Sequence, residues 1–163
     1  MAQELNVVEV YNDLHKIPEL GFQEVKTSAY IAEKLKEMGY EVTTGVAKTG
    51  VVAVEKGAEP GPCIMVRADM DALPFKINGE DKVIHACGHD SHSAMLLAIA
   101  SRLKGKIKRG KLKLLFQPAE ETLKGALEVI DAGVLEDVDM ALGLHIRPAT
   151  DIPEGTIAAA LMH

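Results

Sequence analysis

The sequence lacks three features that would each direct its interpretation: a set of cysteines, a long apolar run and an excess of positive charge. Its two cysteines in 163 residues are too few for a disulfide framework. No stretch approaches the roughly 20 apolar residues that span a bilayer, and the N-terminus has neither the basic nor the apolar region of a signal peptide. We therefore expect a cytoplasmic protein without a membrane partner.

The charge argues against nucleic acid as a partner. The net charge is -6 and the isoelectric point is about 5.5, whereas phosphate binding needs concentrated Lys and Arg. The basic cluster Lys104–Arg109 lies between two apolar segments and is interpreted as a solvated turn. The composition that is present, 47% hydrophobic and 26% charged residues, suits one soluble domain with a sizeable core.

Apolar periodicity predicts an α/β fold. Residues spaced by three and four predict a helix from Val25 to Met38 that Gly39 ends. The run Cys63–Ala68 predicts a central strand buried on both faces, with Cys63 in the core. Further helices are expected at 6–15, 91–103 (capped by Asp90 or Ser91) and 121–132, strands at 40–44, 51–55, 112–116, 138–145 and 155–161, and a loop at 69–90. This alternation favours a mixed, largely parallel sheet with helices packed against it.

The densest cluster of reactive side chains is His85–His92, which holds three imidazoles, a thiol and a carboxylate. Cys87 and His89 are good ligands for a borderline metal such as Zn²⁺, and Gly88 between them would let the backbone approach the ion. One alternative is a chance cluster around a helix start. Another is nucleophilic catalysis by Cys87 with a histidine base, which needs an orienting group and an oxyanion hole that the sequence does not show. We prefer a metal site.

Glu120 and Glu121 follow a predicted strand through Pro118. Adjacent residues in a turn point in different directions, so one carboxylate can bind a metal while the other acts as a base on water. The alternative is an acidic helix start, which the helix dipole favours. His145 ends another predicted strand, and a lone histidine there is more often structural than a ligand.

Asp69 and Asp71 come directly after the predicted central strand. A carboxylate at that position could orient a ligand histidine, and turn chemistry leading into Pro74 is the alternative. All of these polar groups follow strand ends, and the crevice at the carboxyl ends of strands is where open α/β sheets bind ligands.

Five blocks together resemble, in the same order, the M20 metallopeptidase family, in particular its aminoacylase and hippurate-hydrolase-like branch. They are Leu14–Phe22, Arg67–Pro74, His85–His92, Phe116–Glu121 and Gly143–His145. The resemblance implies a zinc-peptidase-like domain with helices on both faces of the sheet. It also implies substrates that are N-acyl amino acids, related amides or small peptides, which a metal-activated water hydrolyses.

The resemblance further implies the roles of individual residues. Cys87 would bridge two divalent metal ions (Zn, Mn, Co or Ni), with His89, Glu121 and His145 as further ligands. Glu120 would be the general base, and Asp69 the catalytic-site aspartate that orients a metal ligand.

Two departures from the family pattern shape our expectations. Family members continue into a lid and dimerisation domain and return with another metal-binding histidine, so 1–163 would be the N-terminal portion of the catalytic domain without its lid. His163 is not assigned that role, and a homo-oligomer is left open. A catalytically incomplete metal-binding domain is the alternative function. After Glu121 the segment Thr122–Ala126 replaces a glycine-rich stretch, so we expect a different loop shape beside the metals.

Overall fold

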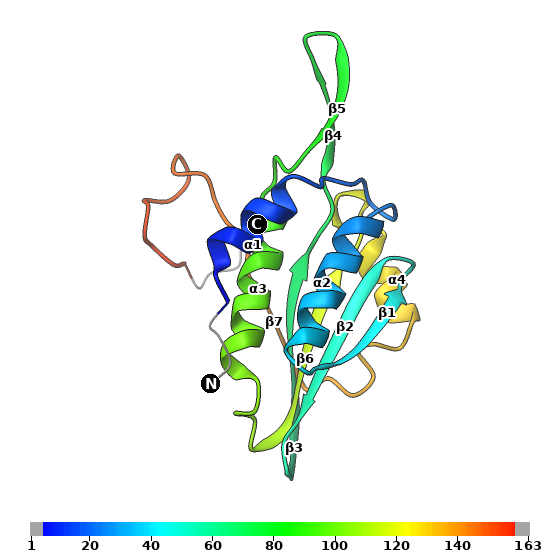
Figure 1. Ribbon diagram of the computed structural model, residues 1–163, viewed down its shortest axis with the longest axis vertical. Coiled ribbons are helices and arrows are strands. Elements are labelled where there is room, and N and C mark those ends of the chain that lie inside the picture. The colour runs from blue at the N-terminus through cyan, green and yellow to red at the C-terminus, as the bar shows by residue number, and fades with distance from the viewer. Residues whose placement is uncertain (1–4, 159–163) are drawn as a thin grey trace.

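A five-stranded mixed sheet, with strands in the order β1-β2-β6-β3-β7, forms the centre of the fold. The structure is a computed structural model that describes residues 5–158, and Figure 1 shows the arrangement of its elements. The sheet strands are β1 (Glu41–Val46), β2 (Gly50–Lys56), β3 (Glu59–Asp69), β6 (Arg109–Gln117) and β7 (Met140–Gly143). The helices are α1 (Val7–His15), α2 (Val25–Glu37), α3 (His89–Leu103), the 3₁₀ helix η1 (Glu120–Thr122) and α4 (Gly125–Asp131).

Strand direction decides where the functional groups gather. β6, β3 and β7 run parallel to one another, while β1 and β2 join the sheet through antiparallel pairings. In the register of β3, Asp69 lies opposite Gln117 of β6 and Arg67 lies opposite Gly143 of β7. The carboxyl ends of these three strands therefore meet at one edge of the sheet.

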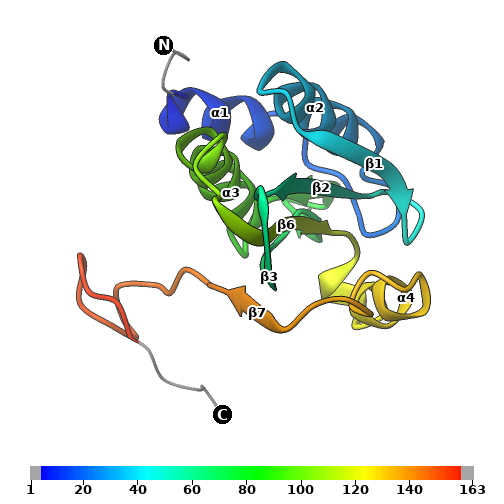
Figure 2. The ribbon, with the colours of Figure 1, turned by 90° about the horizontal axis from the view of Figure 1, so that it is seen from below.

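Helices cover both faces of the sheet, as expected. Figure 2 shows α1, α2 and α3 on one face and α4 on the other. In β6, Leu114 and Phe116 belong to the large core cluster with α1–α3, and Leu115 belongs to the smaller cluster that includes Val129 of α4. Because successive side chains of a strand point to opposite faces, this central strand is apolar at consecutive positions.

The start of α3 differs from the prediction, because neither Asp90 nor Ser91 caps the helix. Gly88 occupies the N-cap with a φ of +87°. The buried Asp90 accepts a hydrogen bond from His15 Nδ1 at 2.6 Å, and Ser91 Oγ donates to the carbonyl of Gly88 at 2.6 Å. The helix thus begins at His89, two residues earlier than predicted.

The predicted loop at 69–90 is also wrong, because it contains the hairpin of β4 (Leu73–Ile77) and β5 (Glu80–Ile84), which projects from the domain in Figure 1. Asn78 and Gly79 form its turn with φ of +53° and +84°, the conformation that two-residue hairpin turns need. The density of polar residues hid this Asn-Gly signal.

Three further boundaries differ from the predictions. The helix predicted at 121–132 is split into η1 and α4, and Leu123 between them has a positive φ of 58°. β7 is shorter than the predicted strand 138–145. Residues 155–158 form a turn and irregular backbone instead of a strand, and 159–161 lie outside the described residues. Cys63 is buried, as expected. Among the helices at 5–158, none has the length and apolar character needed to cross a membrane.

Candidate metal centre

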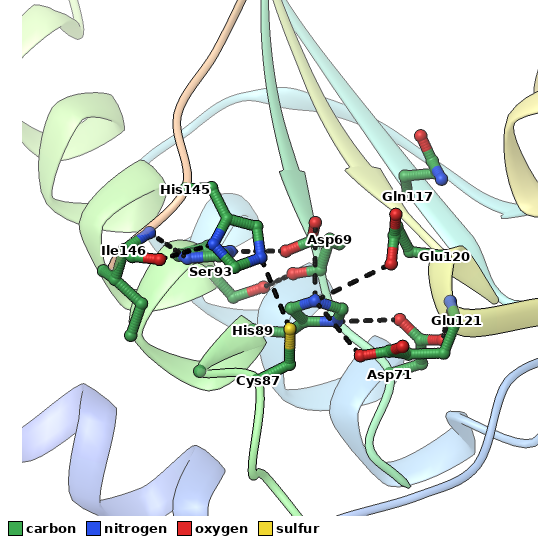
Figure 3. Close-up of polar contacts among 12 residues, drawn as sticks. Asp69, Asp71, Cys87, His89, Ser93, Gln117, Glu120, Glu121, His145 and Ile146 are labelled. Carbon is green, nitrogen blue, oxygen red and sulfur yellow. Dashed lines mark hydrogen bonds and ion pairs between the residues drawn. The ribbon is translucent and has the colours of Figure 1, made fainter. Parts of the chain in front are cut away.

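The six predicted site residues come together at the carboxyl edge of the sheet (Figure 3). Asp69 ends β3, Glu120 and Glu121 follow β6, and His145 follows β7, while Cys87 and His89 lie at the start of α3. The ligand atoms of Cys87, His89 and His145 all lie within 4.8 Å of one another, and the same is true of His89, Glu120 and Glu121. His89 belongs to both groups and is the centre of the site.

Hydrogen bonds orient both candidate histidine ligands. His89 Nδ1 lies 3.0 Å from Asp71 Oδ1, and His145 Nδ1 lies 2.5 Å from its neighbour's carbonyl, that of Ile146. Because a carbonyl or a carboxylate accepts, each Nδ1 carries the proton and each Nε2 presents a lone pair in the neutral ring. His145 Nε2 lies 3.4 Å from Cys87 Sγ. Both lone pairs therefore face the other candidate ligands.

A cation would fit between two of these residues. Within the part of the chain that the structure describes, His89 Nε2 and Glu121 Oε1 are buried and lack a hydrogen-bond partner, and these two atoms are 3.7 Å apart. Ligands at about 2.0–2.2 Å from a tetrahedral Zn²⁺ lie roughly 3.4 Å from each other. The donor types also fit, because imidazole, thiolate and carboxylate are the usual ligands of zinc in proteins.

The charges around His89 favour a cation as well. Asp69 Oδ2 and Glu120 Oε2 lie 3.7 Å and 3.9 Å from His89 Nε2. Burial by itself lowers the pKa of His89, but the hydrogen bond to Asp71 and the nearby carboxylates outweigh it and raise the pKa above its ordinary value. Burial, the neighbouring Glu121 carboxylate and, less strongly, Asp69 and Glu120 raise the pKa of Cys87 to about 12. A divalent ion would relieve this excess of negative charge.

Each of the two aspartates contacts a different histidine. Asp71, 1% exposed, contacts His89 and also accepts from the backbone N of Glu121 at 3.0 Å, so it supports two candidate ligands. Asp69, fully buried, instead contacts His92 Nδ1 at 2.6 Å and Arg67 Nη1 at 2.7 Å. The orienting contact to a candidate ligand histidine, which the resemblance gives to Asp69, is made here by Asp71.

Sequence reasoning missed a support beneath Glu120 and Glu121. Glu24 is fully buried and accepts from the backbone N of Ala119 at 2.8 Å and from Thr49 Oγ1 at 2.6 Å. Ala119 has a φ of +52°, so its position in the turn depends on such a contact. Glu24 lies just beyond the block Leu14–Phe22, and nothing local in the sequence distinguishes it from a surface glutamate.

The role of glycine at position 88 differs from the one that the sequence suggested, which was a close approach of the backbone to an ion. A Cβ on this residue would lie 2.2 Å from Cδ1 of Ile146. Its positive φ favours glycine, and an added Cβ would have to displace the end of the Ile146 side chain. Gly88 therefore lets the segment after β7 pack against the start of α3, which brings His145 to Cys87.

Comparison with known proteins gives a consistent family. The model of peptidase family M20/M25/M40 matches residues 65–161. The chain is 42% identical to an N-acetyl-L-cysteine deacetylase of Bacillus subtilis, over 94% of this chain and 39% of that protein. It is 44% identical to a hippurate hydrolase of Campylobacter jejuni, over 86% of this chain and 39% of that protein.

A solved structure agrees with these relatives. The YXEP protein of Bacillus subtilis, described as a dinuclear metal-binding peptidase of the M20 family, superposes with a TM-score of 0.78 at 40% identity, over 87% of this chain and 43% of that one. The chain spans about two fifths of the length of the curated relatives it matches. On the family match and these identities, the chain belongs to peptidase family M20/M25/M40.

Proposed function

We propose that this chain is the metal-binding part of a metal-dependent amidohydrolase that cleaves the amide bond of N-acyl amino acids or related small amides. The observation that carries the proposal is the buried pair of unpartnered ligand atoms, His89 Nε2 and Glu121 Oε1, 3.7 Å apart. Buried polar atoms without partners are rare in folded proteins and require an explanation. A bound cation supplies one here.

Four residues would hold two divalent ions: Cys87 as the shared ligand, with His89, Glu121 and His145. Zn²⁺, Mn²⁺, Co²⁺ and Ni²⁺ are all candidates, and the thiolate favours the softer ones. When bound, such ions lower the pKa of their bound water toward about 7 and polarise an amide carbonyl. Binding of the ions would also neutralise the negative charge of the carboxylates around His89.

Glu120 is the proposed general base. Its side chain is 34% exposed, so it remains open to water and substrate, and its Oε2 lies 3.9 Å from His89 Nε2. Glu120 takes a proton from the attacking water as the new carbon–oxygen bond forms. It then gives that proton to the amine nitrogen as the carbon–nitrogen bond breaks, so the proton balance closes. Asp71 holds His89 in the required tautomer throughout.

The names of the relatives support the substrate class. An N-acetyl-L-cysteine deacetylase, a hippurate hydrolase and an N-acyl-L-amino acid amidohydrolase of Geobacillus stearothermophilus, 41% identical to this chain, are among them. The substrates in these names are N-acyl amino acids. We propose the same class here, with an N-acetyl or N-benzoyl amino acid as the first compound to assay.

The two adjacent glutamates provide the test. Glu121→Gln should lower the metal content after dialysis, because a neutral amide is a weak ligand. Glu120→Gln should keep the metal and lose turnover by about 10²–10⁴-fold. Metal content is measured on this chain, and turnover on the protein at the length that its source cells produce. Near-wild-type kcat in Glu120→Gln would refute the assignment of the base.

A catalytically incomplete metal-binding domain is the second candidate. The observation that favours it is that His145, one of the proposed ligands, is exposed in the part of the chain that the structure describes. Metal binding without turnover in the protein at its natural length would select this alternative. Turnover that depends on added metal would select the amidohydrolase.

A further inference from the structure

His92 packs against His89 and His145 of the candidate metal centre, yet both of its ring nitrogens already have partners. The side chain is 1% exposed. Nδ1 lies 2.6 Å from Asp69 Oδ1, and Nε2 accepts from the backbone N of Ile146 at 3.0 Å. An amide N–H can only donate, so Nε2 is the unprotonated nitrogen and Nδ1 carries the hydrogen that Asp69 accepts. His92 therefore has no lone pair left for a metal.

The sheet fixes the partner of His92. Asp69 ends β3 and also accepts from Arg67 Nη1 at 2.7 Å. Arg67 Nε in turn donates to Gln117 Oε1 on β6 at 3.0 Å, and Ser93 Oγ donates to the carbonyl of Asp69 at 2.9 Å. Asp69 is thus held by β3, β6 and α3 together, so the tautomer and orientation of His92 follow from the core of the fold.

The other partner of His92 belongs to the exposed part of the site. Residues 140–158 are exposed in nearly every position, His145 included. The N–H of Ile146 is bound by His92, and the carbonyl of the same residue is bound by Nδ1 of His145 at 2.5 Å. The rings of His92 and His145 pack edge to face with centroids 4.6 Å apart.

We propose that His92 is a positioning residue that transmits the rigidity of the sheet to His145. The path runs from Asp69 through the ring of His92 to the N–H of Ile146, and from there to the neighbouring ligand. Through this path Nε2 of His145 is aimed at Cys87 before any ion binds. The inference rests on the proposed function only in taking His145 as a ligand.

Two substitutions separate the two contacts of His92. In His92→Asn, the side-chain amide can still donate to Asp69 from the position of Nδ1, and the contact to Ile146 is lost. In His92→Gln, the side-chain oxygen can accept from Ile146 at the position of Nε2, and the contact to Asp69 is lost. If His92 only filled space, the effects of the two variants would not follow the contact with Ile146. The pair of variants therefore isolates the positioning role.

The first measurement is amide hydrogen exchange of Ile146 in the metal-free chain, with the ring tautomer of His92 read from its ¹⁵N shifts. We expect the Nδ1–H tautomer in the wild type. Exchange should be about tenfold faster in His92→Asn, as the loss of one hydrogen bond implies, and close to wild type in His92→Gln. Equal exchange in all three chains, or the Nε2–H tautomer, would overturn the inference.

The second measurement is the affinity for Zn²⁺ or Co²⁺. His92→Asn should bind about 10–100-fold more weakly, the range typical for the loss of a group that orients a ligand, and His92→Gln should lose less. Wild-type affinity in His92→Asn would refute the positioning role. If the wild type bound no metal, the proposed function would fail, while the exchange of Ile146 would still decide whether His92 holds this segment.

Discussion

The candidate metal centre has two sides that are built differently. On one side His89 and Asp71 lie inside the domain, where His89 is fully buried and Asp71 is 1% exposed, on α3 and just after β3. On the other side His145 lies on the exposed segment that follows the edge strand β7. The first side is held by the packed core, whereas the second depends on a few contacts, those of His92 and Gly88 with Ile146.

This difference implies different responses to metal. The buried side already has its tautomer and its side-chain directions fixed by Asp71, so it should change little when an ion binds. The exposed side is held by fewer bonds, chiefly that of His92 with Ile146, so it should gain further order when an ion binds, because metal binding and folding of a ligand segment are coupled.

Removal of Asp71 should have the largest effect, because it supports two candidate ligands of the buried side. Asp71→Ala leaves His89 Nδ1 and the backbone N of Glu121 without their acceptor. We expect a 10–100-fold loss of metal affinity, at about the scale of an orienting group, and about 2–4 kcal/mol of lost stability. Isothermal titration and thermal unfolding measure the two effects.

The control for Asp71 is Asp81→Ala in the β4–β5 hairpin. The side chain of Asp81 is 92% exposed and its ion pair with Lys76 spans 3.9 Å, so its contribution to stability is small. Equal metal affinity in the two variants would show that the buried side does not depend on Asp71.

Glu24 tests the support beneath the Glu120–Glu121 turn, also on the buried side. Glu24→Ala leaves the N–H of Ala119 unpaired and should lower stability by about 1–3 kcal/mol. Glu24→Gln retains an oxygen that can accept from Ala119 and should be much closer to the wild type. Chemical denaturation of both variants gives the comparison, and an equally large loss in both would contradict the hydrogen-bond account.

The same residue predicts a dependence on pH. Burial is the main cause that raises the pKa of Glu24 above its ordinary value of 4.5. Between the unfolded and folded pKa values the folded chain binds more protons than the unfolded chain, so this group makes stability fall as the pH rises. Glu24→Gln cannot ionise, so its stability relative to the wild type should improve as the pH rises above 4.5. A difference that is constant with pH would contradict the direction.

Gly88→Ala should have the smallest effect on stability and acts on the exposed side. The positive φ costs a residue with a Cβ about 1–2 kcal/mol. Gly79→Ala is the matched control, because Gly79 has a φ of +84° and no atom within 4 Å of an added Cβ. Both variants should lose similar stability. Only Gly88→Ala should also weaken metal binding, because its Cβ displaces Ile146. Equal metal affinity in the two variants would show that the position of Ile146 does not affect metal binding.

The sequence allowed the convergence of the candidate ligands to be predicted, because parallel strands bring their carboxyl ends to one edge. It did not allow us to predict which aspartate contacts which histidine. Asp69 and Asp71 are two apart on one extended segment, and His89 and His92 are three apart on one face of α3. Either aspartate could have met either histidine, and only the placement of α3 against β3 decides that Asp71 meets His89.

Two other features depended on long-range packing or were obscured by composition. Glu24 contacts Ala119 across 95 positions of sequence, and no local pattern reports such a contact. The β4–β5 hairpin did have a local signal in Asn78-Gly79, but the surrounding charged residues favoured a loop. The start of α3 was misplaced because Asp90, a good capping residue by type, is used by His15 instead.

The most direct test of the central claim compares the two cysteines. Cys87 is a candidate ligand, whereas Cys63 is buried in β3 with 2% exposure, away from the carboxyl edge of the sheet. The metal content of the wild type, Cys87→Ala and Cys63→Ala is measured by elemental analysis after loading with Zn²⁺ and dialysis. We predict about one ion or more per chain in the wild type and in Cys63→Ala, and a clear loss in Cys87→Ala. The same metal content in all three chains would contradict a metal centre built on Cys87.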